Sequence, residues 1–212
     1  MASCNVIIDL SHNNRNVDFG RIQADGILGI IHKATQGSGF TDPTFTTRRE
    51  AARNAGLLWG AYHFGTAADP VGQAQFFLKV ASPAPNDVIV LDLETNPANP
   101  SNTMSLDQAR AFIEAVRDAT GTMPGLYGGA YLKEQLGDAV DPTLQACWLW
   151  WAQYGPAPAI PTTWPKWTLW QYTDGHHGNP PFTVDSIGPC DRDQYNGTTD
   201  ELQAKWGTGT LV

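Results

Sequence analysis

Residues 88–94 read Val-Ile-Val-Leu-Asp-Leu-Glu, an apolar run that ends in two carboxylates. Four apolar, mostly β-branched residues are typical of a strand buried on both faces. Because side chains alternate along a strand, we expect Asp92 and Glu94 on one face and Leu93 on the other. Neighbouring carboxyls push their pKa values apart, so one could act as an acid and the other as an anion. The alternative is a strand that simply ends in a polar loop.

The elements that would position this pair form a regular alternation. The 212 residues, 42% hydrophobic and 16% charged, fit one globular domain. Helical patterns cover residues 42–56, 71–80 and 105–121, with Asp42 expected to cap the first and Ser105 and Gln108 to form a capping box on the third. Strands are predicted at residues 6–10, 27–33, 58–64, 88–94, 125–128, 148–152 and 168–172, with an eighth near 191–195.

Strands that alternate with helices at this spacing predict βαβ units and a parallel sheet. The helical patterns weaken after residue 137, where prolines crowd the chain. We therefore predict an α/β fold: a single-domain irregular (β/α) barrel over residues 1–212, TIM-like, with reduced helices in its C-terminal part.

Polar and aromatic residues occur where most of these strands end. In a β/α barrel the carboxyl ends of the strands meet on one face, where active sites lie. Acidic, aromatic and amide groups together suit a sugar-binding cleft, with flat faces for stacking and carboxylates for catalysis. Besides Asp92 and Glu94, the candidates are Asp9, Tyr62, His63, Tyr127, Trp151, Trp170, Gln171, Asp191 and Asp193.

Charge and spacing exclude several other classes. The net charge is −8 and no Lys/Arg cluster exists, which argues against nucleic acid or an anionic membrane as a partner. No apolar run reaches the roughly 18 residues of a membrane span, and residues 1–5 do not resemble a signal peptide, so we expect cytoplasmic synthesis and export by another route. The five histidines are scattered, so no metal and no cofactor is predicted. Reduced thiols are the expected state of the three cysteines, although Cys4 and Cys190 could lie close together.

Six motifs in a fixed order resemble those of the glycoside hydrolase family 25 lysozymes, the Chalaropsis-type N-acetylmuramidases. The resemblance runs from Ile8 to Gly197, essentially the whole chain. No single motif is specific, but their order and spacing are. They are Asp-Leu-Ser-His at 9–12, Lys-Ala-Thr-Gln-Gly at 33–37, Gly-Ala-Tyr-His-Phe at 60–64, Leu-Asp-Leu-Glu at 91–94, Trp-Gln-Tyr at 170–172 and Asp-Arg-Asp-Gln-Tyr-Asn-Gly at 191–197.

The resemblance implies hydrolysis of the β-1,4 bond between N-acetylmuramic acid and N-acetylglucosamine in peptidoglycan. It implies Glu94 as proton donor and then base, and Asp92 as the group that orients the substrate's acetamido group. An acetamido or a carboxylate nucleophile stays open at this point. Asp9 and Asp191 match the remaining acids, with Asp191 preferred over Asp193, and Lys33 could be a charge partner of one acid or part of a structural pair. The other strand-end candidates would bind substrate.

The expected partner is the peptidoglycan glycan strand, bound by a monomer without a separate wall-binding module. The biological role would be that of a phage endolysin released through a holin or of a secreted antibacterial toxin with an immunity protein and delivery machinery. Two alternatives to a muramidase are a non-catalytic glycan-binding barrel and a chitinase-like N-acetylglucosaminidase.

Overall fold

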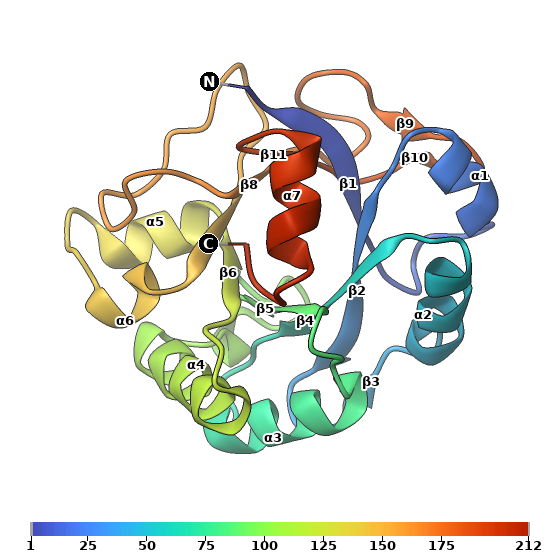
Figure 1. The fold of residues 1–212 in the computed structure, drawn as a ribbon. Coiled ribbons are helices and arrows are strands. Elements are labelled where there is room, and N and C mark those ends of the chain that lie inside the picture. The colour runs from blue at the N-terminus through green and yellow to red at the C-terminus, as the bar shows by residue number, and fades with distance from the viewer. Residues whose placement is uncertain (1, 212) are drawn as a thin grey trace.

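Eight strands close into a barrel in the computed structural model, which describes residues 2–211 (Figure 1). The barrel closes because β1 pairs with β2 on one side and with β11 on the other. Its strands, in spatial order, are β1 (Cys4–Leu10), β11 (Arg192–Tyr195), β8 (Leu169–Thr173), β7 (Trp148–Ala152), β6 (Gly125–Gly128), β5 (Val88–Asp92), β4 (Leu58–Phe64) and β2 (Gly29–Gln36). The predicted irregular β/α barrel is confirmed.

Three short strands lie outside the closed ring. β3 (Phe40–Thr41) forms a hairpin with β2, and β9 (Thr183–Val184) pairs with β10 (Gly188–Pro189) in a separate two-stranded sheet. These strands extend the loops around the barrel and do not contribute to its wall.

The direction of β11 corrects one expectation. The other seven barrel strands run parallel, but β11 is antiparallel to both of its neighbours, β1 and β8. Its first residues therefore lie at the barrel end where the parallel strands finish. Asp191 reaches that end because it comes immediately before β11, and not because a strand ends there.

Helices surround the first part of the barrel and become sparse afterwards (Figure 1). In the described residues no helix connects β7 to β8 or β8 to β11, as the weak patterns after residue 137 predicted. The helices are α1 (Phe19–Ala24), α2 (Phe45–Asn54), α3 (Pro70–Ala81), α4 (Leu106–Thr120), α5 (Ala130–Leu136), α6 (Pro142–Gln145) and α7 (Thr199–Trp206), with a 3-10 turn η1 (Pro100–Asn102).

Two helix starts test the capping predictions. The box on α4 is present: the Ser105 side chain accepts from the Gln108 N–H, and the Gln108 side chain accepts in return from the Ser105 N–H. The prediction for the start of α2 was wrong by two residues. Its N-cap is Thr44, and the Asp42 carboxylate instead accepts from the Thr44 N–H at 2.9 Å and the His12 N–H at 2.8 Å.

Alternate residues on each strand divide the buried side chains into two layers. One layer packs between strands and surrounding helices, and the other fills the barrel interior. At the end where the parallel strands begin, α7 seals the interior and lies in the middle of the ring of strands in Figure 1. Trp206 donates from Nε1 to the Trp59 carbonyl at 2.9 Å, and a Cβ atom on Gly29 would lie 2.9 Å from its ring.

Two further findings bear on the sequence analysis. None of the helices in residues 2–211 is long and apolar enough to cross a membrane. Cys4, Cys147 and Cys190 are free thiols in the structure.

Candidate active site

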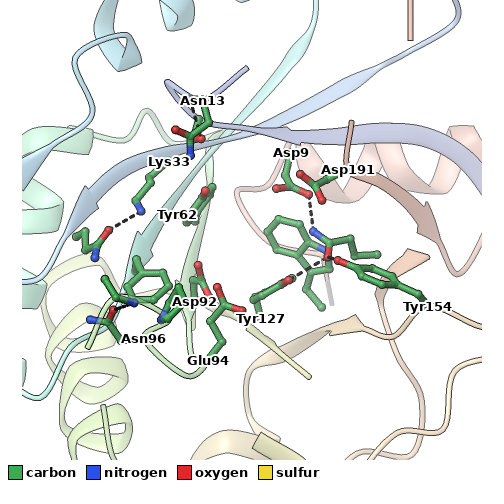
Figure 2. Close-up of a pocket in the computed structure, with 17 residues that line it drawn as sticks. Asp9, Asn13, Lys33, Tyr62, Asp92, Glu94, Asn96, Tyr127, Tyr154 and Asp191 are labelled. Atoms are coloured by element: carbon green, nitrogen blue, oxygen red, sulfur yellow. Dashed lines mark hydrogen bonds between the residues drawn. The ribbon is translucent and has the colours of Figure 1, made fainter. Parts of the chain in front are cut away.

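A cavity of about 480 Å³ opens at the barrel end opposite α7 (Figure 2). Each of the seven parallel strands places there the residue that continues its inward-facing series, so the cavity floor is the top of the barrel interior. The cavity contains four carboxyls, three tyrosines and several amides. Its lining includes Asp9, Asn13, Lys33, Gln36, Tyr62, Phe64, Asp92, Glu94, Asn96, Tyr127, Trp150, Tyr154, Gln171 and Asp191.

Asp92 and Glu94 enter this cavity from the end of β5. Asp92 is the last residue of the strand, and Leu93 turns outward into the layer between barrel and helices. Backbone bonds hold the segment on both sides, since Leu93 N–H donates to the Tyr127 carbonyl and Gly65 N–H to the Asp92 carbonyl, each at 3.0 Å. The two acids therefore share the inward face, as the strand pattern predicted.

The environment of both carboxyls favours their protonated forms. Burial raises the pKa of Asp92 well above its usual value, and the neighbouring Glu94 charge adds to the effect. Burial also raises the pKa of Glu94, while the positive charge of Lys33 lowers it. Asp92 is 6% exposed, and its Oδ1 has no hydrogen-bond partner within the described residues. A pair in this state can supply one proton and one negative charge to a bound molecule.

Asp9 and Asp191 form a second acidic group, which Figure 2 shows together on one side of the cavity. Asp9 accepts a hydrogen bond from Gln171 Nε2 at 2.8 Å. Burial raises the pKa of Asp9 well above its usual value, with Asp191 adding to it. Burial raises the pKa of Asp191 to about 6, with the charge of Asp174 as the next cause.

Gln171 connects this acidic group to two tyrosines. Its Oε1 accepts from the hydroxyls of Tyr127 and Tyr154, each at 3.0 Å, while its amide nitrogen donates to Asp9. The amide is thereby fixed in orientation, and each of its two ends has a defined donor or acceptor role. Hydroxyl and amide groups held in this way can bind sugar hydroxyls without first reorganising.

Four predicted site residues do not line this cavity. His63, Trp151 and Trp170 each follow or precede an inward residue by one position, so their side chains face the helices. His63 is fully buried, contacts Thr35 Oγ1 at 2.7 Å and stacks on Phe112, so it is not part of the cavity wall. Asp193 faces inward but lies completely buried, where its Oδ1 accepts from Trp150 Nε1 at 2.7 Å.

A second hollow of about 550 Å³ adjoins the first and does include Trp151. Glu94, Tyr127 and Tyr154 line both hollows, so Glu94 lies at their boundary. The Trp151 ring is only 1% exposed, and its Nε1 donates to Gln153 Oε1 at 2.9 Å. Trp151 thus forms part of the wall with little surface for stacking.

Trp150, Tyr154 and Lys33 are cavity residues that the sequence analysis did not assign to substrate binding. Position along the strand was the signal for Trp150: it is in phase with Trp148, the inward residue two positions earlier. Lys33 is likewise in phase with Ile31 on β2. Tyr154 lies in the loop after β7, where no periodic pattern exists to place it.

Within residues 2–211, no group of three or more His, Cys, Asp or Glu side chains is arranged to hold a metal ion.

Comparisons with known proteins point in one direction. The profile of Glycosyl hydrolases family 25 matches residues 8–179. Lysozyme M1 of Streptomyces globisporus is 28% identical over 221 residues, covering 93% of this chain and 69% of the relative. N,O-diacetylmuramidase of Chalaropsis sp is 28% identical over 189 residues, covering 79% and 87%. A solved family GH25 lysozyme from Aspergillus fumigatus superposes with a TM-score of 0.80 at 30% identity, covering 98% of this chain and 100% of that chain.

Proposed function

The chain belongs to glycosyl hydrolases family 25, and from this premise we propose that it is a peptidoglycan muramidase. It would cleave the β-1,4 bond between N-acetylmuramic acid and N-acetylglucosamine. The relatives named lysozyme and N,O-diacetylmuramidase support this substrate. The observation that carries the proposal is the pair Asp92 and Glu94: buried Asp92 ends β5, half-buried Glu94 follows two residues later, and both line one cavity.

Glu94 is proposed to act first as an acid and then as a base. In its protonated form it would donate to the glycosidic oxygen as the bond to the anomeric carbon breaks. The resulting Glu94 carboxylate would then take a proton from the water that attacks the anomeric carbon. Its raised pKa supports the first step, because the proton must still be present near neutral pH.

Asp92 is proposed to assist the acetamido group of the bound N-acetylmuramic acid. The acetamido oxygen would bond to the anomeric carbon as the leaving oxygen departs, and the nitrogen would become positively charged as its N–H donates to Asp92. The attacking water would then displace the acetamido oxygen from the anomeric carbon and restore the neutral acetamido group. The unpartnered Oδ1 of Asp92 supports this role, since a buried acceptor without a donor is costly unless a ligand supplies one. Removal of one group that stabilises the transition state electrostatically slows a reaction by roughly two to three orders of magnitude.

The remaining cavity groups are proposed to bind the glycan. Asp9 and Asp191 would hold sugar hydroxyls and tune the charge of the pair, and Tyr62, Tyr127 and Gln171 would complete the polar wall. For the setting, we propose a monomer that acts on the bacterial cell wall after release as a phage lysin or secretion as a toxin.

Product analysis tests the proposal directly. Purified peptidoglycan is digested, the new reducing ends are reduced with borohydride, and the fragments are identified by mass spectrometry. Reduced muramic acid is expected. Reduced N-acetylglucosamine would instead identify a glucosaminidase, and the absence of any product from folded protein would identify a binding barrel. The digestion is repeated with the Asp92→Asn variant, for which we expect a lower kcat. A change in KM alone would mean that Asp92 only binds the substrate.

A further inference from the structure

Lys33 stands apart from the other residues of the first cavity. Among the lining residues within 2–211 it is the one Lys or Arg, in a cavity that also holds four acids. Its side chain comes from β2 in phase with Ile31, so it faces the barrel interior. The proposed mechanism assigns it no step, although it lies beside the pair that carries the reaction.

The contacts of Lys33 leave its charge without a direct counter-ion. Nζ donates to the neutral side-chain oxygen of Gln36 at 2.6 Å. It also lies 4.9 Å from the Phe64 ring centroid and 5.8 Å from that of Phe40, within the range of cation–π attraction. None of the ion pairs found in residues 2–211 involves Lys33. Two aromatic faces and one amide therefore hold the ammonium in place.

The acids that Lys33 faces lie on three elements. Asp92 and Glu94 come from β5 and the turn after it, and Asp42 precedes α2; their negative charges raise the pKa of Lys33, against the larger lowering effect of burial. Figure 2 shows Asp9 and Asp191 on the opposite side of the cavity from Lys33. The positive charge therefore acts mainly on Asp92 and Glu94, and Asp191 opposes it at Glu94.

We propose that Lys33 is a positioning residue whose charge favours the ionised forms of Asp92 and Glu94 together, and that Gln36 fixes the ammonium without neutralising it. The proposal rests on the proposed function for the roles of the two acids. It deepens that function by naming the group that sets the pH range in which the pair is active.

The sign of the effect follows from the charges. A nearby cation favours the ionised form of a carboxyl, so removing it raises the pKa values of Asp92 and Glu94 together. Activity is lost in acid when both carboxyls of the pair are protonated and lost in base when both are ionised. Both limbs of the pH profile therefore move upward when the charge of Lys33 is removed or cancelled.

Four variants separate charge from shape. Lys33→Met removes the cation and Lys33→Arg retains it, while Gln36→Glu places a carboxylate against Nζ and Gln36→Met is its uncharged control. The pH profile of kcat/KM on peptidoglycan is measured for each variant. In parallel, the titration of Asp and Glu side chains is followed by carboxyl ¹³C NMR, which requires no turnover.

For Lys33→Met and Gln36→Glu we expect both limbs to move upward by about 0.5 to 1 pH unit, the size of effect that one partly screened charge produces. Lys33→Arg should keep the wild-type positions of the limbs, and Gln36→Met, which retains the cation but loses the contact that fixes it, should move them less than Gln36→Glu does. If Lys33→Met and Gln36→Glu lower activity equally at every pH with unmoved limbs, Lys33 is only structural and the proposal is overturned.

The NMR titration keeps the two proposals distinguishable. If the wild-type protein releases no muramic acid, the proposed function fails, yet the carboxyl titrations of Asp92 and Glu94 still report the influence of Lys33. Unchanged titrations in both charge-altering variants would overturn the Lys33 proposal even in an active muramidase. Should Lys33→Met fail to fold, Gln36→Glu alone decides between these outcomes.

Discussion

At the end of the barrel sealed by α7, the interior is filled with apolar side chains, whereas at the opposite end the same strands present acids. β5 illustrates the change within five residues: Val88 and Val90 belong to the apolar interior, and Asp92 follows in phase with them at the cavity. β7 likewise carries Trp148 and then Trp150, whose indole faces the buried carboxyl of Asp193. We call the end sealed by α7 the lower end and the end that contains the cavity the upper end. Apolar packing dominates the lower end, and acidic and polar groups occupy the upper end.

This difference indicates where the stability of the protein resides. Burying an apolar side chain such as Trp206 favours folding, while burying carboxyls without counter-ions opposes it. The acids at the upper end have raised pKa values for that reason. The free energy gained in packing the lower end offsets the cost of the acidic cavity, so substitutions at the two ends should have separable effects.

The largest expected effect is on catalysis at the upper end. Glu94→Gln removes the proton donor but keeps the shape, so kcat should fall by up to about 10⁴-fold. The melting temperature should stay the same or rise, since a buried ionisable group is lost. Steady-state kinetics and calorimetry measure the two quantities. The exposed Glu114→Gln on α4 is the matched control, and a Glu94→Gln protein with near-normal turnover would contradict the acid assignment.

Trp206→Ala reverses this pattern at the lower end. Removal of a fully buried indole from the interior should lower the free energy of unfolding by about 3–5 kcal/mol. Below the melting transition, kcat per folded molecule should stay close to the wild-type value. Denaturant unfolding monitors the first quantity, and Trp206→Phe, which retains part of the packing, should fall between. A large loss of kcat in fully folded Trp206→Ala would show that the two ends are coupled.

Asp191→Asn tests the cost of the acidic end through pH. The pKa of Asp191 is about 6 in the folded protein against an ordinary 3.8, so the folded state binds this proton more tightly than the unfolded state. The stabilising contribution is thus full below pH 3.8 and is lost as the pH rises to 6. The variant should be more stable than wild type by about 3 kcal/mol at pH 7 and equally stable near pH 3.5.

Denaturation midpoints across this pH range provide the measurement for Asp191→Asn. The exposed Asp118→Asn on α4 serves as the control, because no buried charge is removed there. A constant difference between Asp191→Asn and wild type at every pH would mean that ionisation of Asp191 is not the cause.

The smallest expected effect concerns the helix that seals the lower end. Thr198 and Glu201 form a capping box at the start of α7, and Thr198→Ala should cost about 1 kcal/mol of stability. Ser105→Ala removes the equivalent box of α4, outside the barrel, and should cost a similar amount. Chemical denaturation compares the two. A much larger loss for Thr198→Ala would indicate that α7 melts as a unit and opens the barrel.

The sequence predicted elements well where periodicity is strong. Residues 125–128 and 148–152 are strands with the predicted bounds, and the box at Ser105 begins α4 as expected. The sequence analysis missed α7 because this helix is only eight residues long and packs its apolar face against the lower end of the barrel interior. No local pattern distinguishes such a helix from a surface segment, although its capping box was visible in the sequence.

The candidate site was predicted where strand phase was used and missed where only strand position was used. Asp92 and Glu94 were placed by alternation, and both line the cavity. Position at a strand end alone, without regard to the face of the strand, led to the prediction of His63, Trp151 and Trp170. Each is one position out of phase with an inward neighbour, and a shift of one residue turns a strand side chain to the other face.

The closure of the barrel between β1 and β11 has a consequence for how the protein is made. Asp9 and its partner Gln171 are 162 positions apart, and α7 comes later still. The ribosome releases the N-terminus first, so the edge of β1 that pairs with β11 stays unpaired until β11 emerges. Such long-range pairing is slow to form. The acidic cavity is therefore assembled only after β11 has emerged, and a nascent chain that lacks β11 cannot yet attack a glycan.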